Sequence, residues 1–366
     1  MSKRSFDRPL LVIVLLLVSF GFIIFLSASL GLLTREAVSF EAVALKQLVF
    51  GLIFGGLALI FFSHLNYKYL RVYSFYFFVA SFFLTALVFV PGIGFEHGGA
   101  RRWLSIGSFT FQPSELLRLA FVVYFAAWLS MAKEKVRDIR FGLAPFIILS
   151  GISGVVLLFQ PDTDAFLTLF LAGLAMFLVS GARARDILIL LFLGVLGSLT
   201  LLFFRPYLKE RFLAFLNLGD VDYYGAGYQI YQSLIALGSG GLTGRGFGQS
   251  IQKFGYLPEP IGDSIFAVAG EEFGFIGASA LIILFLLFTL RGLRIAGRAP
   301  DSFSGLLALG IVILIISQSF INIASMLALF PLSGTPLVFV SKGGTALLIA
   351  LLEVGILLNI SRYQKT

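Results

Sequence analysis

The stretch LGSGGLTGRGFGQSIQKFGYLPEPIGDSIFAVAGEEFGFIG, residues Leu237–Gly277, lies between two long apolar blocks and resembles neither. Its glycines exclude a regular helix over 238–248, because each glycine weakens a helix. Pro258 and Pro260 then impose an extended path, since proline lacks an N–H and restricts the residue before it. Asp263 follows, where a long apolar run begins. A carboxylate held there by a Gly/Pro loop is unusual for packing alone, so we expect the function to lie there.

The composition is that of a polytopic membrane protein. Of the 366 residues, 58% are hydrophobic and only 13% are charged, and the mean hydropathy is +0.98; soluble domains carry about 25% charged residues. The absence of cysteine excludes disulfides and thiolate metal sites, and His64 and His97 lie too far apart in sequence to indicate a zinc site. The net charge of +8 would suit nucleic-acid binding, but membrane orientation explains it better.

Apolar segments of about 20 residues, the length that crosses a bilayer, recur through the chain. The ten candidates are approximately 10–30, 43–63, 70–91, 114–131, 142–159, 165–181, 186–204, 264–290, 304–328 and 340–361. No repeat of fixed period is visible. We therefore predict one all-α membrane domain over residues 1–366, with about ten transmembrane helices and a large extracytoplasmic loop, about 205–262, between helices 7 and 8.

The distribution of Lys and Arg predicts the orientation. With a cytoplasmic N-terminus, the inner side carries 16 Lys and Arg residues and the short outer loops carry 5. The long loop holds 5 more, but long loops translocate largely regardless of charge. Both termini are therefore expected in the cytoplasm, with the Gly/Pro loop outside.

Three outer segments carry the unusual residues. They are 92–113 with Arg101, Arg102 and Trp103, 160–164 with two aspartates, and the Gly/Pro-broken 330–345 with Lys342. Irregular backbone at membrane depth is tolerated only where it is buried or lines a cavity. We expect the outer ends of the third, eighth and tenth spans to meet at a cavity open to the outer leaflet.

Ionisable residues inside predicted spans are costly and indicate pairing or function. Glu115 and Arg118 are spaced i, i+3 on one face of the fourth span. They form either a buried ion pair that locks helices together or part of the cavity floor. Glu271 and Glu272 lie in the eighth span. We expect one of them to hydrogen-bond nearby backbone and the other to line the cavity.

Two further choices stay open on the outer side. Arg101, Arg102 and Trp103 either anchor a helix end at the headgroup level, or bind a diphosphate and a sugar through guanidinium and indole groups. Asp263 is either the N-cap of the eighth span or a functional carboxylate. Phe266 stands three residues after it, so no capping box supports the first interpretation.

Six motifs, taken in order, resemble the SEDS family of RodA/FtsW-type peptidoglycan glycosyltransferases. They are GGARRWL at 98–104, FQPSELLRL at 111–119, QPD at 160–162, GYQIYQSLIALGSGGLTGRGFGQSIQKFGYLPEP at 227–260, FAVAGEEFGFIG at 266–277 and LFPLSGTPLVFVSKGGTALL at 329–348. The resemblance runs essentially end to end. QKFGYLPEP and the ending ILLNISRY are closer to the FtsW type than to the RodA type.

The resemblance implies polymerisation of lipid II at the outer face of the bacterial cytoplasmic membrane, in division or elongation. The family's essential aspartate falls on Asp263, its tryptophan on Trp103, and its pair in the fourth span on Glu115 and Arg118. The implied partners are lipid II, a class B penicillin-binding protein with transpeptidase activity, and other divisome or elongasome membrane proteins; no nucleic acid is expected.

The sequence departs from the family pattern at two places. Ile261-Gly262 stand where the family usually has His-Thr before the aspartate, and Lys342 stands where a tyrosine is usual. The first changes the local hydrogen bonding near Asp263. The second places a cation where a phenol is expected, which adds a candidate contact for a diphosphate.

Glycosyl transfer from a lipid diphosphate needs three things. A base must accept the proton of the acceptor hydroxyl, positively charged protein groups must stabilise the leaving diphosphate, and a pocket must align the two sugars. We expect Asp263 to be the base of an inverting single displacement. Candidates for the diphosphate are Arg101, Arg102, Arg245 and Lys342. We expect the glycines of 238–248 to let backbone approach substrate or to flex as a lid.

The sequence is also compatible with a divalent-cation cofactor and with two other functions. A divalent cation, Mg²⁺ or Mn²⁺, between a carboxylate and the diphosphate is compatible with this chemistry, although no ligand set is evident. A lipid II flippase would also use an outer cavity and intramembrane charges, but no inverted repeat is visible and the polar residues lie outside the midplane. A non-catalytic scaffold for a transpeptidase is the third interpretation.

Overall fold

The computed structural model describes residues 5–34, 40–97, 100–106, 109–216 and 227–364. Four of the cations counted above, Lys3, Arg4, Arg35 and Lys365, lie outside these ranges, as do the first two glycines of GGARRWL.

Helices dominate the described chain. The longer ones are α1 (Arg8–Ser29), α3 (Phe54–His64), α5 (Ser74–Ala86), α6 (Pro113–Ala132), α7 (Leu143–Phe159), α8 (Thr163–Val179), α9 (Ala184–Phe204), α10 (Pro206–Leu216), α11 (Tyr228–Ser239), α12 (Ile265–Gly297), α13 (Ser302–Met326) and α14 (Gly344–Ser361). Short helical pieces are η1 (Leu30–Thr34), α2 (Phe40–Lys46), the π-helix η2 (Gln47–Ile53), α4 (Lys68–Val72), η3 (Leu87–Phe89) and η4 (Lys133–Arg137).

The predicted architecture of a polytopic α-helical membrane protein is confirmed. Within the described ranges, seven helical segments are long and apolar enough to cross a membrane, and three shorter apolar helices, Ser74–Phe89, Leu143–Phe159 and Thr163–Val179, accompany them. These ten segments coincide with the ten predicted from hydropathy. The number that cross the bilayer and the side on which the long loop lies remain predictions.

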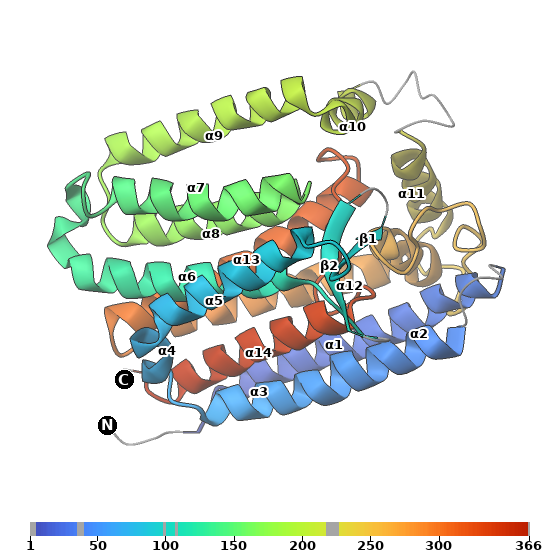
Figure 1. The fold of residues 1–366 in the computed structure, drawn as a ribbon. Helices are drawn as coiled ribbons and strands as arrows, with labels where there is room; N and C mark the ends of the chain where they lie inside the picture. Colours follow the sequence, from blue (N-terminus) through green and yellow to red (C-terminus); the bar gives the residue numbers. More distant parts are fainter. Residues whose placement is uncertain (1–4, 35–39, 98–99, 107–108, 217–226, 365–366) are drawn as a thin grey trace.

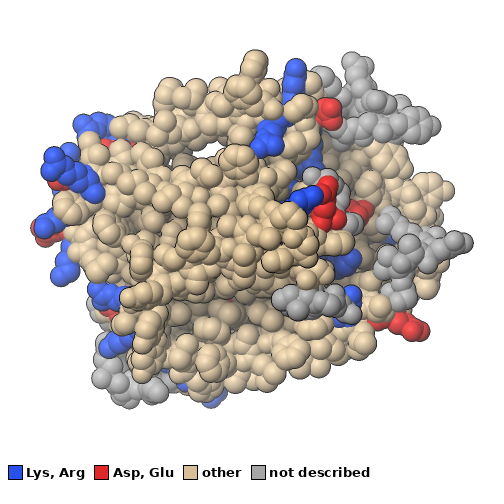
Figure 2. All heavy atoms as spheres, viewed as in Figure 1, with Lys and Arg blue, Asp and Glu red and all other residues tan. Residues whose placement is uncertain are grey.

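The long helices run side by side, and both chain ends lie at one end of the bundle (Figure 1). Segments α13 and α14 are mostly buried, whereas α9 lies at the edge with almost all of its surface exposed (Figure 1). On the face shown in Figure 2, Lys and Arg lie towards both ends of the bundle, including a group at the end with the termini, and the surface between them carries almost no charge. An uncharged belt of this kind suits a hydrocarbon environment.

The opposite end of the bundle holds structure that hydropathy does not reveal. Helices α10 and α11 occupy parts of the long loop, and three short antiparallel strands precede α6 (Figure 1). The strands are β1 (Gly94–His97), β2 (Ala100–Ile106) and β3 (Phe109–Phe111), in the order β1-β2-β3. The sheet fixes the segment that contains Arg101, Arg102 and Trp103.

Helix α12 is interrupted at Gly274, which has φ 64° and ψ −165°. The interruption leaves backbone N–H and C=O groups of α12 without partners inside the helix. The glycine-rich loop over 241–246 forms hydrogen bonds to these groups. Arg245 N–H donates to Glu271 O at 3.0 Å, and Phe275 N–H donates to Gly241 O at 2.9 Å. Two more such bonds complete the pairing, from Gly246 N–H to Glu272 O and from Ile276 N–H to Leu242 O. The loop is therefore fixed to α12, which does not support the expectation of a flexible lid.

Gly274→Ala should lower stability, because its φ is one that side chains rarely adopt and a Cβ would clash with the backbone nitrogen of Gly244. Such strain costs about 1–3 kcal/mol. Gly297→Ala is the matched control, since a Cβ there meets nothing within 4 Å. Thermal unfolding in detergent compares the two variants with wild type. Equal melting temperatures for all three would contradict the role of the kink.

Candidate active site

Asp263 is placed immediately before α12 but does not cap it. The helix begins at Ile265 and its N-cap is Ser264. The N-cap interpretation of Asp263 is therefore wrong. Instead, the backbone around Asp263 is held from outside: Asn322 Nδ2 donates to Asp263 O at 2.6 Å, and Ser341 Oγ donates to Gly262 O at 2.7 Å.

The side chain of Asp263 belongs to a charged group gathered around Gly334. A methyl group on Gly334 would lie 3.7 Å from Asp263 Oδ2, 3.8 Å from Asp164 Oδ2 and 3.9 Å from Arg211 Nη1. Asp164 also accepts the Gly334 N–H at 2.9 Å, and Arg211 donates to Leu332 O at 3.4 Å. Three segments far apart in sequence therefore meet on the irregular 330–343 segment.

These surroundings raise the pKa of Asp263 to about 7. Burial is the largest cause, because it disfavours the charged form. The negative charges of Glu259 and Asp164 raise the pKa further, while Arg211 and Arg102 lower it. A carboxylate with this pKa can accept a proton near neutral pH, which is the property of a general base.

Of the residues in the predicted sugar and diphosphate site, Arg102 reaches this group. It donates to Gln160 O at 3.3 Å and to Pro161 O, in the turn that leads to Asp164. Arg101 instead pairs with Glu96 of β1 at 2.9 Å and is half-exposed. Trp103 is half-buried in β2 opposite Phe95, and the register of the two strands shifts beside it, between Phe95 and Glu96.

The other two predicted cations differ in position. Lys342 lies beside the segment that carries Asp263, since its N–H donates to Ile261 O at 2.7 Å. The tenth span thus meets the eighth as expected, and the two departures from the family pattern contact each other. Arg245 instead pairs with Glu271 at 3.5 Å, two turns along α12.

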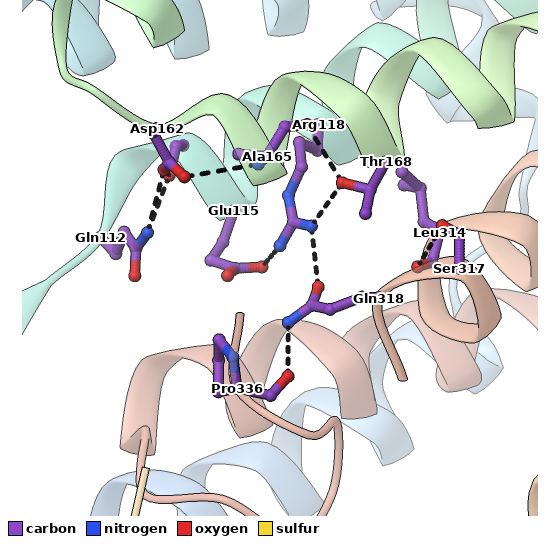
Figure 3. Close-up of polar contacts among 11 residues, drawn as sticks. Gln112, Glu115, Arg118, Asp162, Ala165, Thr168, Leu314, Ser317, Gln318 and Pro336 are labelled. Carbon is purple, nitrogen blue, oxygen red and sulfur yellow. Dashed lines mark hydrogen bonds and ion pairs between the residues drawn. The ribbon is translucent and has the colours of Figure 1, made fainter. Parts of the chain in front are cut away.

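Glu115 and Arg118 form a buried ion pair whose contacts reach the same irregular segment (Figure 3). Arg118 also donates to Thr168 Oγ1 at 3.0 Å and to Gln318 Oε1 at 2.7 Å. Gln318 Nε2 in turn donates to Pro336 O at 3.1 Å. The pair therefore joins α6, α8 and α13, and it supports the segment on which Gly334 lies.

Glu271 and Glu272 both hold the signature loop. Glu271 accepts from Ser250 Oγ at 2.6 Å and from the N–H of Ile251 at 3.0 Å, as expected for one of the two. Glu272 forms a fully buried ion pair with Lys253 Nζ at 2.6 Å. The expectation that the second glutamate lines the cavity is not supported.

A sequence profile described as "Cell cycle protein", for FtsW, RodA and SpoVE, matches residues 8–366. The chain belongs to this family. It is 38% identical to stage V sporulation protein E of Bacillus subtilis over 364 residues, covering 100% of this chain and 99% of that one. It is 36% identical to a probable peptidoglycan glycosyltransferase FtsW of Geobacter metallireducens over 362 residues, covering 99% and 96%.

Solved structures of the family have the same fold. A chain of a peptidoglycan synthase complex that coordinates polymerization and crosslinking has a TM-score of 0.81 at 27% identity, with 99% of both chains covered. The crystal structure of the rod shape determining protein RodA of Thermus thermophilus has a TM-score of 0.69 at 25% identity, also over 99% of both chains. The SEDS resemblance inferred from the motifs is confirmed.

Several residues of this SEDS site were not singled out from the sequence. In the sequence, Arg211 is one of five cations in the long loop, Glu259 lies within the longest motif, and Asp164 is one of two aspartates in a short turn. Their convergence depends on how α10, α8 and the 330–343 segment fold together, and no single motif contains them.

The described side chains do not form a complete metal site in this SEDS protein. Among these residues, no group of three or more His, Cys, Asp or Glu side chains lies close enough to hold an ion. Asp263 and Asp164 come near each other, but the guanidinium of Arg211 lies beside both. The expectation of Mg²⁺ or Mn²⁺ stays a prediction.

For the buried Glu115–Arg118 pair, removing one charge should lower the stability of the protein more than removing both. Arg118→Met leaves the Glu115 carboxylate buried without its partner, which costs about 3–5 kcal/mol. Glu115→Leu combined with Arg118→Met removes both charges and should recover most of that loss. Arg101→Met is the control, because its pair with Glu96 is about half-exposed and such pairs contribute at most about 1 kcal/mol. Thermal unfolding of the four proteins in detergent gives the comparison; a double variant as unstable as Arg118→Met would refute the ion-pair account.

Proposed function

We propose that this protein is a peptidoglycan glycosyltransferase that polymerises lipid II at the outer face of the cytoplasmic membrane. Relatives that align along almost the whole chain are named peptidoglycan glycosyltransferases. The observation that carries the proposal is the placement of Asp263, whose pKa is raised to about 7, among Asp164, Arg102 and Arg211.

In the proposed reaction, the Asp263 carboxylate takes the proton of the acceptor sugar hydroxyl. The hydroxyl oxygen attacks the anomeric carbon of the donor from the side opposite the diphosphate, so the configuration inverts. The bond between that carbon and the diphosphate oxygen breaks, and both its electrons leave with the undecaprenyl diphosphate. We assign the stabilisation of the departing negative charge to three cations, Arg102, Arg211 and Lys342.

The other candidate residues take supporting roles. Arg101, Trp103 and Arg245 remain candidates for substrate contacts outside the charged group around Gly334. Glu115 and Arg118 hold the 330–343 segment in position. Arg211 joins the diphosphate candidates, because its guanidinium lies beside Asp263 and Asp164.

The proposed orientation places both termini in the cytoplasm and Asp263 outside. The excess of Lys and Arg in the terminal and loop segments of the predicted inner side supports it. A class B penicillin-binding protein is the proposed partner, because one similar chain belongs to a complex that coordinates polymerization with crosslinking. We propose α12, the eighth predicted span, as the docking face, because apolar side chains such as Phe275 and Leu290 are exposed on it, whereas α13, the ninth span, is mostly buried and offers little surface. Co-purification from native membranes without any transpeptidase would contradict this partner.

One assay separates the polymerase from the flippase and the scaffold. Purified protein is incubated with lipid II in detergent, with and without EDTA and with and without the partner. Glycan strands formed without a bilayer support the polymerase, and their loss in EDTA would support the Mg²⁺ or Mn²⁺ prediction. Failure to form product even with the partner would favour the flippase or the scaffold.

Asp263→Asn should abolish polymerisation while leaving the fold intact. The substitution is nearly isosteric and removes only the capacity to accept a proton, so the rate should fall by at least about 10²–10⁴-fold. Because the folded protein disfavours ionised Asp263, the variant should melt no lower than wild type at pH 8. Asp138→Asn, on an exposed loop, is the matched control and should remain active. A stable and active Asp263→Asn variant would end the catalytic assignment.

The pH profile should report the charges around Asp263. The base must be ionised, so kcat/KM should rise with pH through a midpoint near 7. Arg211→Gln removes a charge that lowers the pKa, so the midpoint should move up; Glu259→Gln removes one that raises it, so the midpoint should move down. Polymerisation measured from pH 5 to 9 tests these signs, and a midpoint that neither substitution moves would count against Asp263 as the titrating base.

A further inference from the structure

The second predicted span is not a uniform α-helix. It runs through α2, the π-helix η2 and α3, and η2 begins at Gln47. A π-helical turn inside a helix is rare and frequently marks a functional site. Gln47 is only 4% exposed, so its amide needs partners within the protein.

Both ends of the Gln47 amide bond to backbone on either side of Lys342. Its Nε2 donates to Ser341 O at 3.3 Å, and its Oε1 accepts the Gly343 N–H at 3.0 Å. Two glycines follow Lys342, and glycine leaves a chain free to move unless other contacts hold it. One side chain from the second span thus fixes the backbone from which Lys342 projects.

Two of these residues, Ser341 and Lys342, are also bonded to the segment that carries Asp263. Lys342 N–H donates to Ile261 O, and Ser341 Oγ donates to Gly262 O, each at 2.7 Å. The Lys342 side chain is exposed, and among the described residues none bonds its ammonium group. The backbone that carries this cation is therefore fixed to the two residues before Asp263, and the cation itself is available to a ligand.

Close packing allows Gln47 to reach this backbone. A Cβ on Gly51 would lie 2.8 Å from Leu347 Cδ2, and a Cβ on Gly344 would lie 3.0 Å from Phe50 Cβ. Both distances are too short for ordinary contact, so η2 and the start of α14 approach as closely as they do because these residues are glycines.

We propose that Gln47 is a positioning residue, which holds Lys342 where its ammonium binds the diphosphate of the lipid-linked substrate. The inference rests on the proposed function for the identity of the ligand. The positioning itself does not depend on activity. Lysine has a flexible stem, so the geometry of its contact with phosphate depends on where its backbone is fixed.

Hydrogen exchange tests the positioning directly. Gln47→Leu removes both bonds at similar side-chain size, so amide exchange over 337–347 should increase. Gln47→Glu keeps an acceptor for the Gly343 N–H and loses only the donor to Ser341, so its increase should be smaller. Leu48→Ala, one residue along and 39% exposed, is the control and should leave exchange in this segment unchanged. Unchanged exchange in Gln47→Leu would overturn the proposal.

Kinetics test whether the positioning serves substrate binding. Lys342→Ala should raise the KM for lipid II, by roughly 10-fold for one lost charged contact, with a smaller change in kcat. Gln47→Leu should raise KM in the same direction, and the double variant should be no worse than Lys342→Ala alone, because both act through one contact. Additive losses, or a Gln47→Leu variant with less stability but normal KM, would mean that Gln47 has only a structural role.

The two readouts keep the proposals separate. If wild type makes glycan strands but Gln47 variants change neither exchange nor KM, the positioning fails and the function stands. If exchange responds to Gln47→Leu but wild type makes no product from lipid II, the positioning stands and the proposed function fails.

Discussion

The backbone pairing between the kink of α12 and the glycine-rich loop fixes the end of the bundle opposite the chain termini (Figure 1). In a membrane protein, a helix broken at Gly274 would leave amide and carbonyl groups without water to bond, at a cost of several kcal/mol each. The loop over 241–246 supplies four bonds to those groups. The Glu272–Lys253 ion pair, fully buried and bonded to Ser27 of α1, then secures the chain that leads to Pro258. The chain that leads to Asp263 is therefore held at two points, the kink of α12 and Lys253.

Once that path is fixed, the remaining site follows from one other segment, the irregular chain over 330–343. Asn322 and Gln318 of α13 hold two of its carbonyls, at Thr335 and Pro336. Gly334 then lies where Asp263, Asp164 and Arg211 converge. Two carboxylates at close range repel each other, and the neighbouring guanidinium limits that repulsion. The pKa of Asp263 near 7 is the balance of burial and like charge against these cations.

The sequence could predict the apolar spans and could single out Asp263 as the candidate base. It could not predict which side chains surround Asp263. Hydropathy identifies helices such as α12 because the bilayer demands about 20 apolar residues, whatever their partners. The resemblance supplies Asp263 because a motif is contiguous. Arg211 belongs to no motif near Asp263 in sequence, and only the packing of α10 brings them together. Gly274 is one glycine among many, and its φ is set by the loop that pairs with it. The strands before α6 are too short to give a periodic signal.

The junction between Asp263 and the tenth span also explains how the chain tolerates its departures from the family pattern. Ile261-Gly262 and Lys342 differ from the usual residues, yet they meet through the Lys342 N–H and the Ile261 carbonyl. The adjoining bond, from Ser341 to the Gly262 carbonyl, likewise needs no side chain at 262. Because backbone carbonyls accept both bonds, the side chains at these positions can change while Asp263 keeps its place. The side chains at 261, 262 and 342 can therefore differ in charge and shape without moving Asp263. Lys342 adds a cation on backbone that these bonds already hold beside the segment of Asp263.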